Sequence, residues 1–269
     1  MTNAKIKRQF VDTEFGQMHC RVADEFSNEK PLVCLHQSPR SSREFIPFIE
    51  NVSQQRHVIC VDNPGHGESV IPDNSIGIEG YARAVWATLD GLGVGQVDLV
   101  GYHTGSEVAV EMAFQRPKDV DQIVLISALI ATDAEREKFI SDFQPVPLDE
   151  EGSRFKRIWE NAIHYRGPSV TLEILASSLA ESVRAGDAYE WGHQAAFEYS
   201  RVFPERLQSL SHRVTVLNPK DMLYEYTKRI APYLVNGVVT DHPEWGSGFL
   251  ETDPKGASEA VLKAFTGTN

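Results

Sequence analysis

The chain has 269 residues, of which 41% are hydrophobic and 24% charged, so it is long enough to bury the core of one sizeable domain. Its formal net charge of −12 repels nucleic-acid backbones and anionic membrane surfaces, which argues against both as partners. No apolar run approaches the roughly 18 residues of a membrane span, and Met1–Asp12 contains no secretory signal, so we expect a cytoplasmic protein.

The three cysteines, Cys20, Cys34 and Cys60, are odd in number, and their spacing matches no zinc-binding pattern. Two of them stand inside apolar, strand-like runs of the sequence. We therefore expect free, buried thiols in a reducing compartment. We expect no cofactor.

Short apolar runs alternate with helical patterns along the first half of the chain, which is typical of a parallel sheet covered by helices. Residues 6–11 and 18–22 flank a turn at Phe15-Gly16 and predict an opening hairpin. The strands expected next are residues 32–36, 58–61, 96–100 and 123–126. The helices expected between them begin at Ser41 or Ser42, span residues 79–92, and follow Gly105 up to Pro117.

The pattern changes after residue 130. Residues 131–210 contain no buried strand, and residues 155–163 and 172–183 place apolar side chains at helical spacing. Two strands return at residues 214–217 and 238–240, before a last helix that carries Ala257, Val261 and Phe265. The sequence therefore predicts a helical insertion after the sixth strand.

Three motifs stand at the ends of predicted strands. They are His-Gln-Ser-Pro at residues 36–39, Asp-x-Pro-Gly-x-Gly-x-Ser at residues 62–69, and Gly-x-His-x-Gly at residues 101–105. In this order along an α/β chain they resemble the α/β-hydrolase family, whose nucleophile elbow has the form Gly-x-Ser-x-Gly. The resemblance covers nearly the whole chain. It implies a mostly parallel eight-stranded sheet flanked by helices, with a core of residues 1–130 and 211–269 and a helical cap of residues 131–210.

The elbow residue of this chain is a histidine, His103, where the family usually places serine, aspartate or cysteine. The elbow is a strained turn between a strand and a helix, and its central side chain points out of the sheet. Side chains at the flanking positions would collide across the turn, so Gly101 and Gly105 are required sterically. We therefore expect His103 to be presented to a cleft.

The resemblance also fixes the positions of the acid and the base. The acid position corresponds to Asp221, in the turn after residues 214–217, although Asp221 could equally serve as a helix N-cap. We expect Asp221 to reach His103 only through water. The base position holds Ser247 or Gly248 instead of histidine, and we interpret the nearby His242 as a polar residue at a strand end.

An oxyanion hole can survive without the usual nucleophile. The resemblance implies that Thr104 supplies one backbone N–H, with Ser38 or Gln37 supplying the second. Ser106 lies in the following helix, turned away from the elbow tip, and is a poor substitute nucleophile.

His103 has three alternative roles: general base, imidazole nucleophile, or hydrogen-bonding partner of a bound ligand. His103 and Asp221 alone do not make a metal site, so we expect no metal. The aromatic residues of the cap, namely Trp159, Tyr165, Trp191, Phe197 and Tyr199, are candidates to line an apolar roof. The predicted substrate-binding residues are His36, Tyr102, Trp159, Trp191, Trp245 and Ser247.

Two functions remain open from the sequence. The first is an enzyme that acts on a small, partly apolar molecule, either a hydrolase without a Ser-His-Asp triad or a lyase that needs no cofactor, with His103 and Asp221 as its catalytic residues. The second is a binding protein that kept the fold and lost catalysis. The retained glycines and Asp221 favour the first, and the missing base histidine favours the second. A homodimer is left open.

Overall fold

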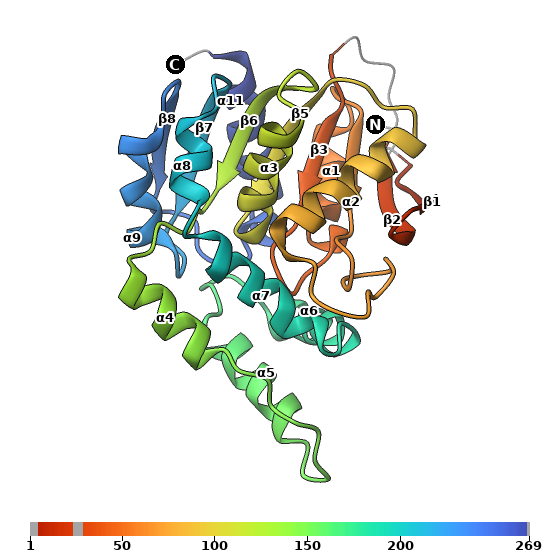
Figure 1. Cartoon of the computed structure of the whole chain (residues 1–269), viewed down its shortest axis with the longest axis vertical. Coiled ribbons are helices and arrows are strands. Elements are labelled where there is room, and N and C mark those ends of the chain that lie inside the picture. The colour runs from red at the N-terminus through yellow and green to blue at the C-terminus, as the bar shows by residue number, and fades with distance from the viewer. Residues whose placement is uncertain (1–4, 24–28, 268–269) are drawn as a thin grey trace.

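A single sheet forms the centre of the computed structural model, which describes residues 5–23 and 29–267. The strands are β1 (Lys7–Thr13), β2 (Gly16–Ala23), β3 (Leu32–Leu35), β4 (Val58–Val61), β5 (Val97–Tyr102), β6 (Val120–Ile126), β7 (Arg213–Pro219) and β8 (Gly237–His242). Their order in the sheet is β1-β2-β4-β3-β5-β6-β7-β8 (Figure 1). The strand β2 runs opposite to the other seven strands, which all point the same way. This confirms the predicted mostly parallel eight-stranded sheet.

Helices cover both faces of the sheet, because its central strands are apolar on both sides. The helices α2 (Gly77–Gly91), α3 (Thr104–Gln115) and α8 (Phe203–Gln208) pack on one face. The other face is covered by α1 (Ile46–Val52), which follows a short 3-10 turn capped by Ser41, and by α10 (Phe249–Thr252) and α11 (Pro254–Thr266). The two cores hold the loops at the strand ends in place.

A helical segment, residues 133–208, connects β6 to β7. It contains α4 (Asp133–Asp142), α5 (Ser153–His164), α6 (Leu172–Arg184), α7 (Ala188–Tyr199) and α8. In Figure 1, α4 to α7 gather at one end of the sheet and α5 projects furthest from it. That this segment forms a separate cap domain with the bounds 131–210 stays a prediction.

A buried ion cluster ties the helical segment to the sheet domain. Arg40, in the loop after β3, donates two hydrogen bonds to Glu251 of α10, at 3.0 and 3.2 Å. Its Nε lies 3.7 Å from Glu181 of α6, and the Ser41 hydroxyl donates to Glu181 at 2.8 Å. The Arg40 and Glu181 side chains are both buried, so this pairing fixes one end of α6 over the loops of the sheet domain.

The three cysteines lie on β2, β3 and β4 as free, buried thiols, as the sequence predicts. Within the described ranges, no helix is both long enough and apolar enough to cross a bilayer. Residues 1–4, 24–28 and 268–269 lie outside the described residues. All of them belong to the predicted core segments, and residues 1–4 also belong to the Met1–Asp12 segment.

Candidate functional site

The tight turn between β5 and α3 carries His103. Its backbone adopts φ 49° and ψ −115°, a conformation that a non-glycine residue rarely takes. A Cβ added to Gly101 would lie 2.2 Å from the Gly105 carbonyl oxygen, and one added to Gly105 would lie 2.0 Å from the Leu35 carbonyl oxygen. The predicted collision across the turn is therefore confirmed for Gly101, whereas Gly105 is required because the end of β3 lies against it. The turn presents the side chain of residue 103 away from the sheet.

His103 is bonded directly to Asp221, which corrects the expectation that the two meet only through water. The Nε2 atom of His103 lies 2.8 Å from Oδ2 of Asp221, and Asp221 follows β7. The Ser127 hydroxyl, just after β6, donates to the same Oδ2 at 2.6 Å. The second oxygen accepts the Leu223 backbone N–H at 2.8 Å, a bond within the turn after β7. Asp221 is not the helix N-cap that the sequence left open, because the next helix, α9 (Tyr224–Thr227), has Leu223 at its N-cap and no side-chain capping bond. The water-bridged expectation failed because it assumed that Asp221 points to the empty base position.

The carboxyl of Asp221 is ionised in this setting. Burial alone would raise its pKa, but the contact with His103 and the hydrogen bonds from Ser127 and Leu223 hold the pKa below its ordinary value. A carboxylate only accepts hydrogen bonds, so the proton of a neutral His103 ring resides on Nε2. Nδ1 then carries the lone pair, and within the described residues it makes no hydrogen bond. His103 lines a cavity, so this lone pair is available to a ligand.

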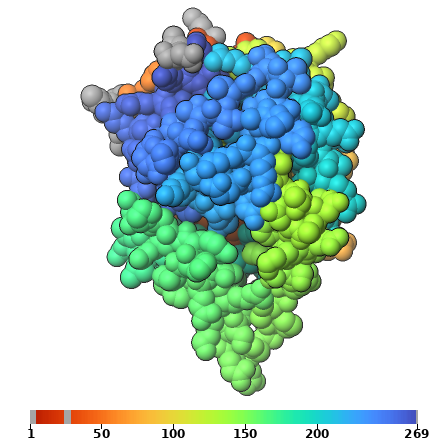
Figure 2. All heavy atoms as spheres, turned by 90° about the vertical axis from the view of Figure 1, so that its left-hand side faces the viewer, coloured from red at the N-terminus to blue at the C-terminus, as the bar shows by residue number. Residues whose placement is uncertain are grey.

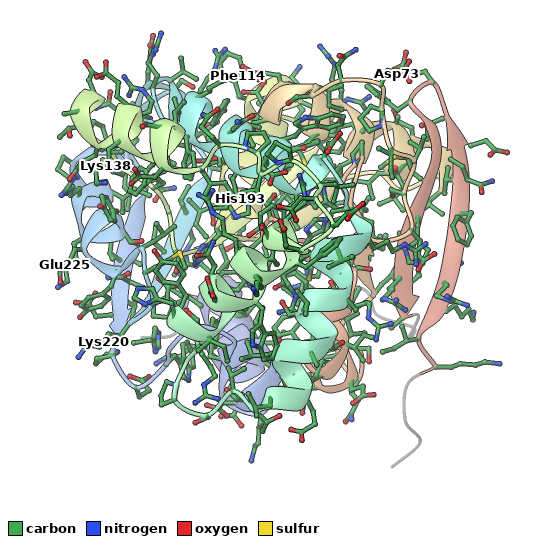
Figure 3. The ribbon with its side chains drawn as sticks, turned by 90° about the horizontal axis from the view of Figure 1, so that it is seen from below. Asp73, Phe114, Lys138, His193, Lys220 and Glu225 are labelled. Carbon is green, nitrogen blue, oxygen red and sulfur yellow. The ribbon has the colours of Figure 1, made fainter. Side chains whose placement is uncertain are left out.

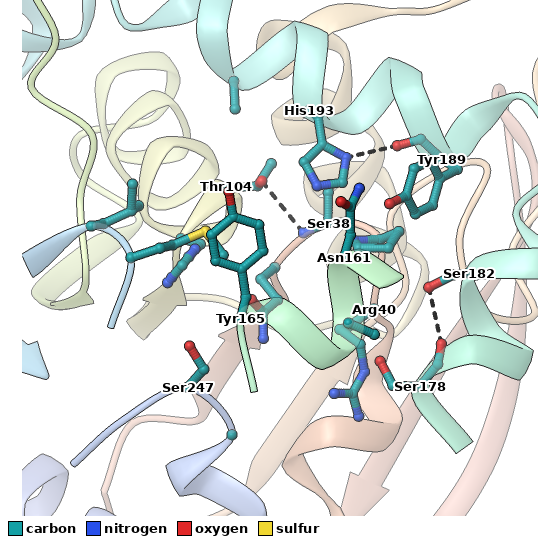
Figure 4. Close-up of a pocket in the computed structure, with 18 of the residues that line it drawn as sticks. Ser38, Arg40, Thr104, Asn161, Tyr165, Ser178, Ser182, Tyr189, His193 and Ser247 are labelled. Atoms are coloured by element: carbon teal, nitrogen blue, oxygen red, sulfur yellow. Dashed lines mark hydrogen bonds between the residues drawn. The ribbon is translucent and has the colours of Figure 1, made fainter. Parts of the chain in front are cut away.

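The residues expected to form an oxyanion hole differ in the hydrogen bonds that their N–H groups already make. Thr104 is the first residue of α3, so its N–H has no partner within the helix. The Ser38 N–H donates to the Thr104 hydroxyl across a long 3.4 Å (Figure 4). Gln37 also lines the cavity, but its backbone N–H and its side-chain amide each donate to Glu44, at 2.9 and 2.8 Å, which favours Ser38 as the second donor. Thr104 and Ser38 remain as the candidate pair, and both line the cavity.

The hydroxyl of Ser106 turns away from the site, as predicted. It donates to the carbonyl oxygens of Gly101 and Ile126, at 2.9 and 3.1 Å. None of the serines that line the cavity, Ser38, Ser178, Ser182 and Ser247, has its hydroxyl hydrogen-bonded to a histidine ring in the described part of the chain. The cavity therefore offers no serine that is set up as a nucleophile.

Ser247 and Gly248 stand on the cavity wall at the position that the family's base would take. His242 does not line the cavity. It lies at the end of β8, where its Nδ1 is 2.9 Å from Glu244 and its ring stacks on Trp245 at 4.1 Å. These contacts agree with the interpretation of His242 as a polar residue at a strand end.

The cavity has a volume of about 440 Å³ and lies between the helical segment and the loops of the sheet domain. Figure 2 shows a hollow on the surface where residues of the helical segment meet those that follow β7. Most of its wall is apolar, including Phe139, Phe143, Ile158, Leu175, Phe197 and Met222. A volume of this size suits a small, largely apolar molecule.

Of the predicted substrate-binding residues, Ser247 lines the cavity and three others from the sheet domain do not. His36 is fully buried, and its Nε2 accepts the Asn63 N–H at 2.9 Å. Tyr102 is buried against the rings of His103 and Phe249. Trp245 stacks on Phe249 and donates to Asp253 at 3.0 Å. These three predictions are corrected, because strand alternation and core packing turn the side chains into the sheet domain.

The aromatic residues of the helical segment divide in a similar way. Tyr165 and Phe197 line the cavity. Trp159 does not, and Trp191 packs into a small core of the helical segment beside Tyr189. Tyr199 is buried and donates to Glu111 at 2.7 Å. The prediction that Trp159 and Trp191 contact a ligand is therefore corrected, because neither belongs to the cavity wall.

Sequence reasoning missed His193, which lies on α7 and lines the cavity. In Figure 4 its ring projects from the helix toward Ser38 and Asn161. Seen from that end of the molecule, it lies near the centre (Figure 3). The sequence signal is its position four residues before Phe197, which also lines the cavity, because residues one helical turn apart share a face.

Comparisons with known proteins agree with this architecture. A family model described as alpha/beta hydrolase fold matches residues 30–160. The chain is 31% identical over 133 residues to a proline iminopeptidase of Lactobacillus delbrueckii subsp. lactis, a match that covers 46% of this chain and 45% of that protein. It is 29% identical over 112 residues to an (E)-2-((N-methylformamido)methylene)succinate hydrolase of Acinetobacter baylyi, covering 41% of this chain and 43% of that one. The chain thus matches less than half the length of these curated relatives.

Among solved structures, Cfl2 from Burkholderia cenocepacia superimposes with a TM-score of 0.83 at 15% identity, covering 97% of this chain and 96% of the other. At this identity the likeness shows the fold alone. The family model, the strand order and the superposition together establish that this chain has the alpha/beta hydrolase fold.

Proposed function

We propose that this protein is an enzyme that acts on a small, partly apolar molecule, with His103 as a general base at the position where serine members of the fold carry their nucleophile. The observation that carries the proposal is the 2.8 Å bond between His103 Nε2 and buried Asp221, beside a cavity of about 440 Å³. The curated relatives described above are named as hydrolases, which supports enzyme activity without giving the substrate.

The chemistry follows from the two nitrogens of the ring. Asp221 holds the Nε2 proton, so Nδ1 removes a proton from a bound water or from an O–H or C–H group of the substrate. The imidazolium that forms is stabilised by the ionised Asp221. Negative charge that develops on the substrate oxygen meets the N–H groups of Thr104 and Ser38, at the positive end of α3. The Thr104 hydroxyl releases the Ser38 N–H when the oxyanion forms.

This arrangement serves two reaction types. If the base activates water, the enzyme is a hydrolase that has no covalent serine intermediate. If it removes a proton from the substrate itself, the enzyme is a lyase that needs no cofactor. In both cases the proton moves to Nδ1 of His103 and returns to the leaving group or to solvent.

A binding protein without catalysis is the second candidate, and one observation favours it. Ser247 and Gly248 occupy the wall where the family's base would stand, so the conventional proton relay has no second histidine there. A protein of this kind would keep the cavity and its ligand but would show no turnover that depends on His103.

An activity screen over esters, lactones, epoxides and β-dicarbonyl compounds separates these candidates. His103→Ala should lower kcat/KM by about 10²-fold or more, the usual contribution of a general base. His242→Ala is the matched control, because His242 lies outside the cavity and should leave the rate unchanged. His103→Ser restores a hydroxyl without a base and should not produce an efficient esterase. A wild-type rate in His103→Ala would remove His103 from catalysis and favour the binding protein.

A further inference from the structure

The cavity contains a second histidine, His193, whose hydrogen bonding determines what it can offer a ligand. Its Nδ1 lies 2.8 Å from the backbone carbonyl oxygen of Tyr189, one turn earlier on α7 (Figure 4). A carbonyl oxygen only accepts, so Nδ1 of His193 carries the proton and Nε2 carries the lone pair. Within the described residues, Nε2 makes no hydrogen bond.

The His193 ring is held in one orientation. It stacks on Phe143 with 4.0 Å between the ring centres and lies 5.3 Å from the Tyr189 ring. Burial and the nearby His103 lower the pKa of His193 to about 4, against the opposing hydrogen bond to Tyr189. The ring is therefore neutral at physiological pH, and its Nε2 remains an acceptor.

Both histidines line one cavity, and each has one ring nitrogen with no hydrogen bond among the described residues, Nδ1 in His103 and Nε2 in His193. The lone pair of His103 is used by the proposed proton transfer. That of His193 has no partner among the described residues and belongs to a mostly apolar wall, which offers few other groups for a ligand's donor. A ligand with an O–H or N–H group satisfies it, whereas an ester, epoxide or ether that lacks such a group does not.

We infer that His193 is a specificity-determining residue that accepts, through Nε2, a hydrogen bond from a hydroxyl or N–H group of the substrate. The substrate class is then a small, partly apolar molecule that carries a hydrogen-bond donor, such as an alcohol, an enol or a secondary amide. This inference rests on the proposed function only in taking the cavity as the substrate site. It concerns binding, so it can be tested without turnover.

Phenol and anisole are suitable probes, because they differ only in the replacement of O–H by O–CH₃. We expect phenol to bind about tenfold more tightly than anisole in calorimetry, the difference that one net hydrogen bond supplies. In protein labelled with ¹⁵N-histidine, phenol should shift the Nε2 resonance of His193 in the direction of an accepted hydrogen bond, and anisole should not. The resonance is assigned by its loss in His193→Phe.

Variants of three histidines test whether the preference for phenol over anisole depends on His193. His193→Phe keeps an aromatic ring against Phe143 and should lose most of the preference for phenol. His242→Phe, outside the cavity, should keep the preference, and so should His103→Ala, because His193 is intact in both. If His193→Phe fails to fold, His193→Gln is the second variant by which the resonance is assigned, and the wild-type ¹⁵N shift then decides the matter.

Three results would overturn the inference: anisole binding as tightly as phenol, no binding of phenol, or an unmoved Nε2 resonance with phenol bound. Any of these, together with a loss of activity in His103→Ala, leaves the proposed function standing and removes only the role of His193. A preference for phenol that depends on His193, together with a wild-type rate in His103→Ala, keeps the role of His193 and removes His103 from the proposed catalysis.

Discussion

Replacing Asp221 by asparagine tests the central contact of the site. The wild-type carboxylate accepts three hydrogen bonds, from His103 Nε2, the Ser127 hydroxyl and the Leu223 N–H. An amide of the same shape has only one oxygen. If that oxygen stays with Leu223, the amide NH₂ faces His103 and donates to it. The ring must then adopt the other tautomer, with the lone pair on Nε2 and the proton on Nδ1. The cavity-facing nitrogen then donates a hydrogen bond instead of accepting a proton.

The expected fall in kcat/KM follows from the interactions that Asp221→Asn removes. Asp221→Asn removes both the required tautomer and the charge that stabilises the imidazolium, so the whole general-base contribution should disappear, about 10²- to 10⁴-fold in kcat/KM. This corresponds to about 3 to 5 kcal/mol of transition-state stabilisation. Ser127→Ala is the matched control. It removes one hydrogen bond but keeps the carboxylate, so we expect a loss of about tenfold or less.

The assay has two readouts. The ¹⁵N spectrum of labelled histidine reports which nitrogen of His103 carries the proton, and kcat/KM on the substrate found by the screen reports catalysis. Wild type and Ser127→Ala should show the proton on Nε2, and Asp221→Asn should show it on Nδ1. A folded Asp221→Asn protein with the proton still on Nε2, or with an unchanged rate, would refute the reasoning.

Three further predictions concern the turn, the loop after β4 and the serines. Gly105→Ala should destabilise the protein by about 3 kcal/mol or more in chemical unfolding, since the new Cβ meets the Leu35 carbonyl oxygen; an unchanged midpoint would show that the turn can relax. Burial would raise the pKa of Asp62, but hydrogen bonds led by that from His19 hold it at about 2. Its stabilisation, about 2 kcal/mol, should therefore be complete above pH 4 and be lost as the pH falls toward 2, so the unfolding free energies of wild type and Asp62→Asn should converge in acid. Sulfonyl fluorides should not label the protein, and a stoichiometric adduct on a cavity serine in mass spectrometry would contradict the assignment of His103.

Local steric rules predicted the strand–helix turn well. The need for glycine at residue 101 depends on a contact with Gly105, four positions along the chain, and this contact is present in the structure. The contact that requires Gly105 is with Leu35 at the end of β3, which local rules do not reveal. The strands and main helices followed from hydrophobic periodicity in the same way. The position of Asp221 after β7 was also predicted correctly.

Partners across the fold could not be predicted from local rules. The direct bond from Asp221 to His103 spans 118 positions, and it depends on how far each side chain reaches between neighbouring strand ends. The tryptophans of the helical segment were misplaced, because a helix pattern does not tell whether an aromatic face meets a cavity or a small core. His193 was missed for the same reason, since its role depends on the orientation of α7 over the turn.

The direct bond between His103 and Asp221 restricts how this site could change during evolution. A serine at residue 103 would leave Asp221 without its ring partner, and a triad would then need a new histidine on the opposite wall. Gly248 cannot supply it, because its backbone has φ 80° and a Cβ there would lie 2.6 Å from Val170. Only residue 247 is left, and Asp221 would have to swing toward it. If His103 is the base, its change to serine alone gives a protein with neither mechanism, so a conversion needs at least one further substitution.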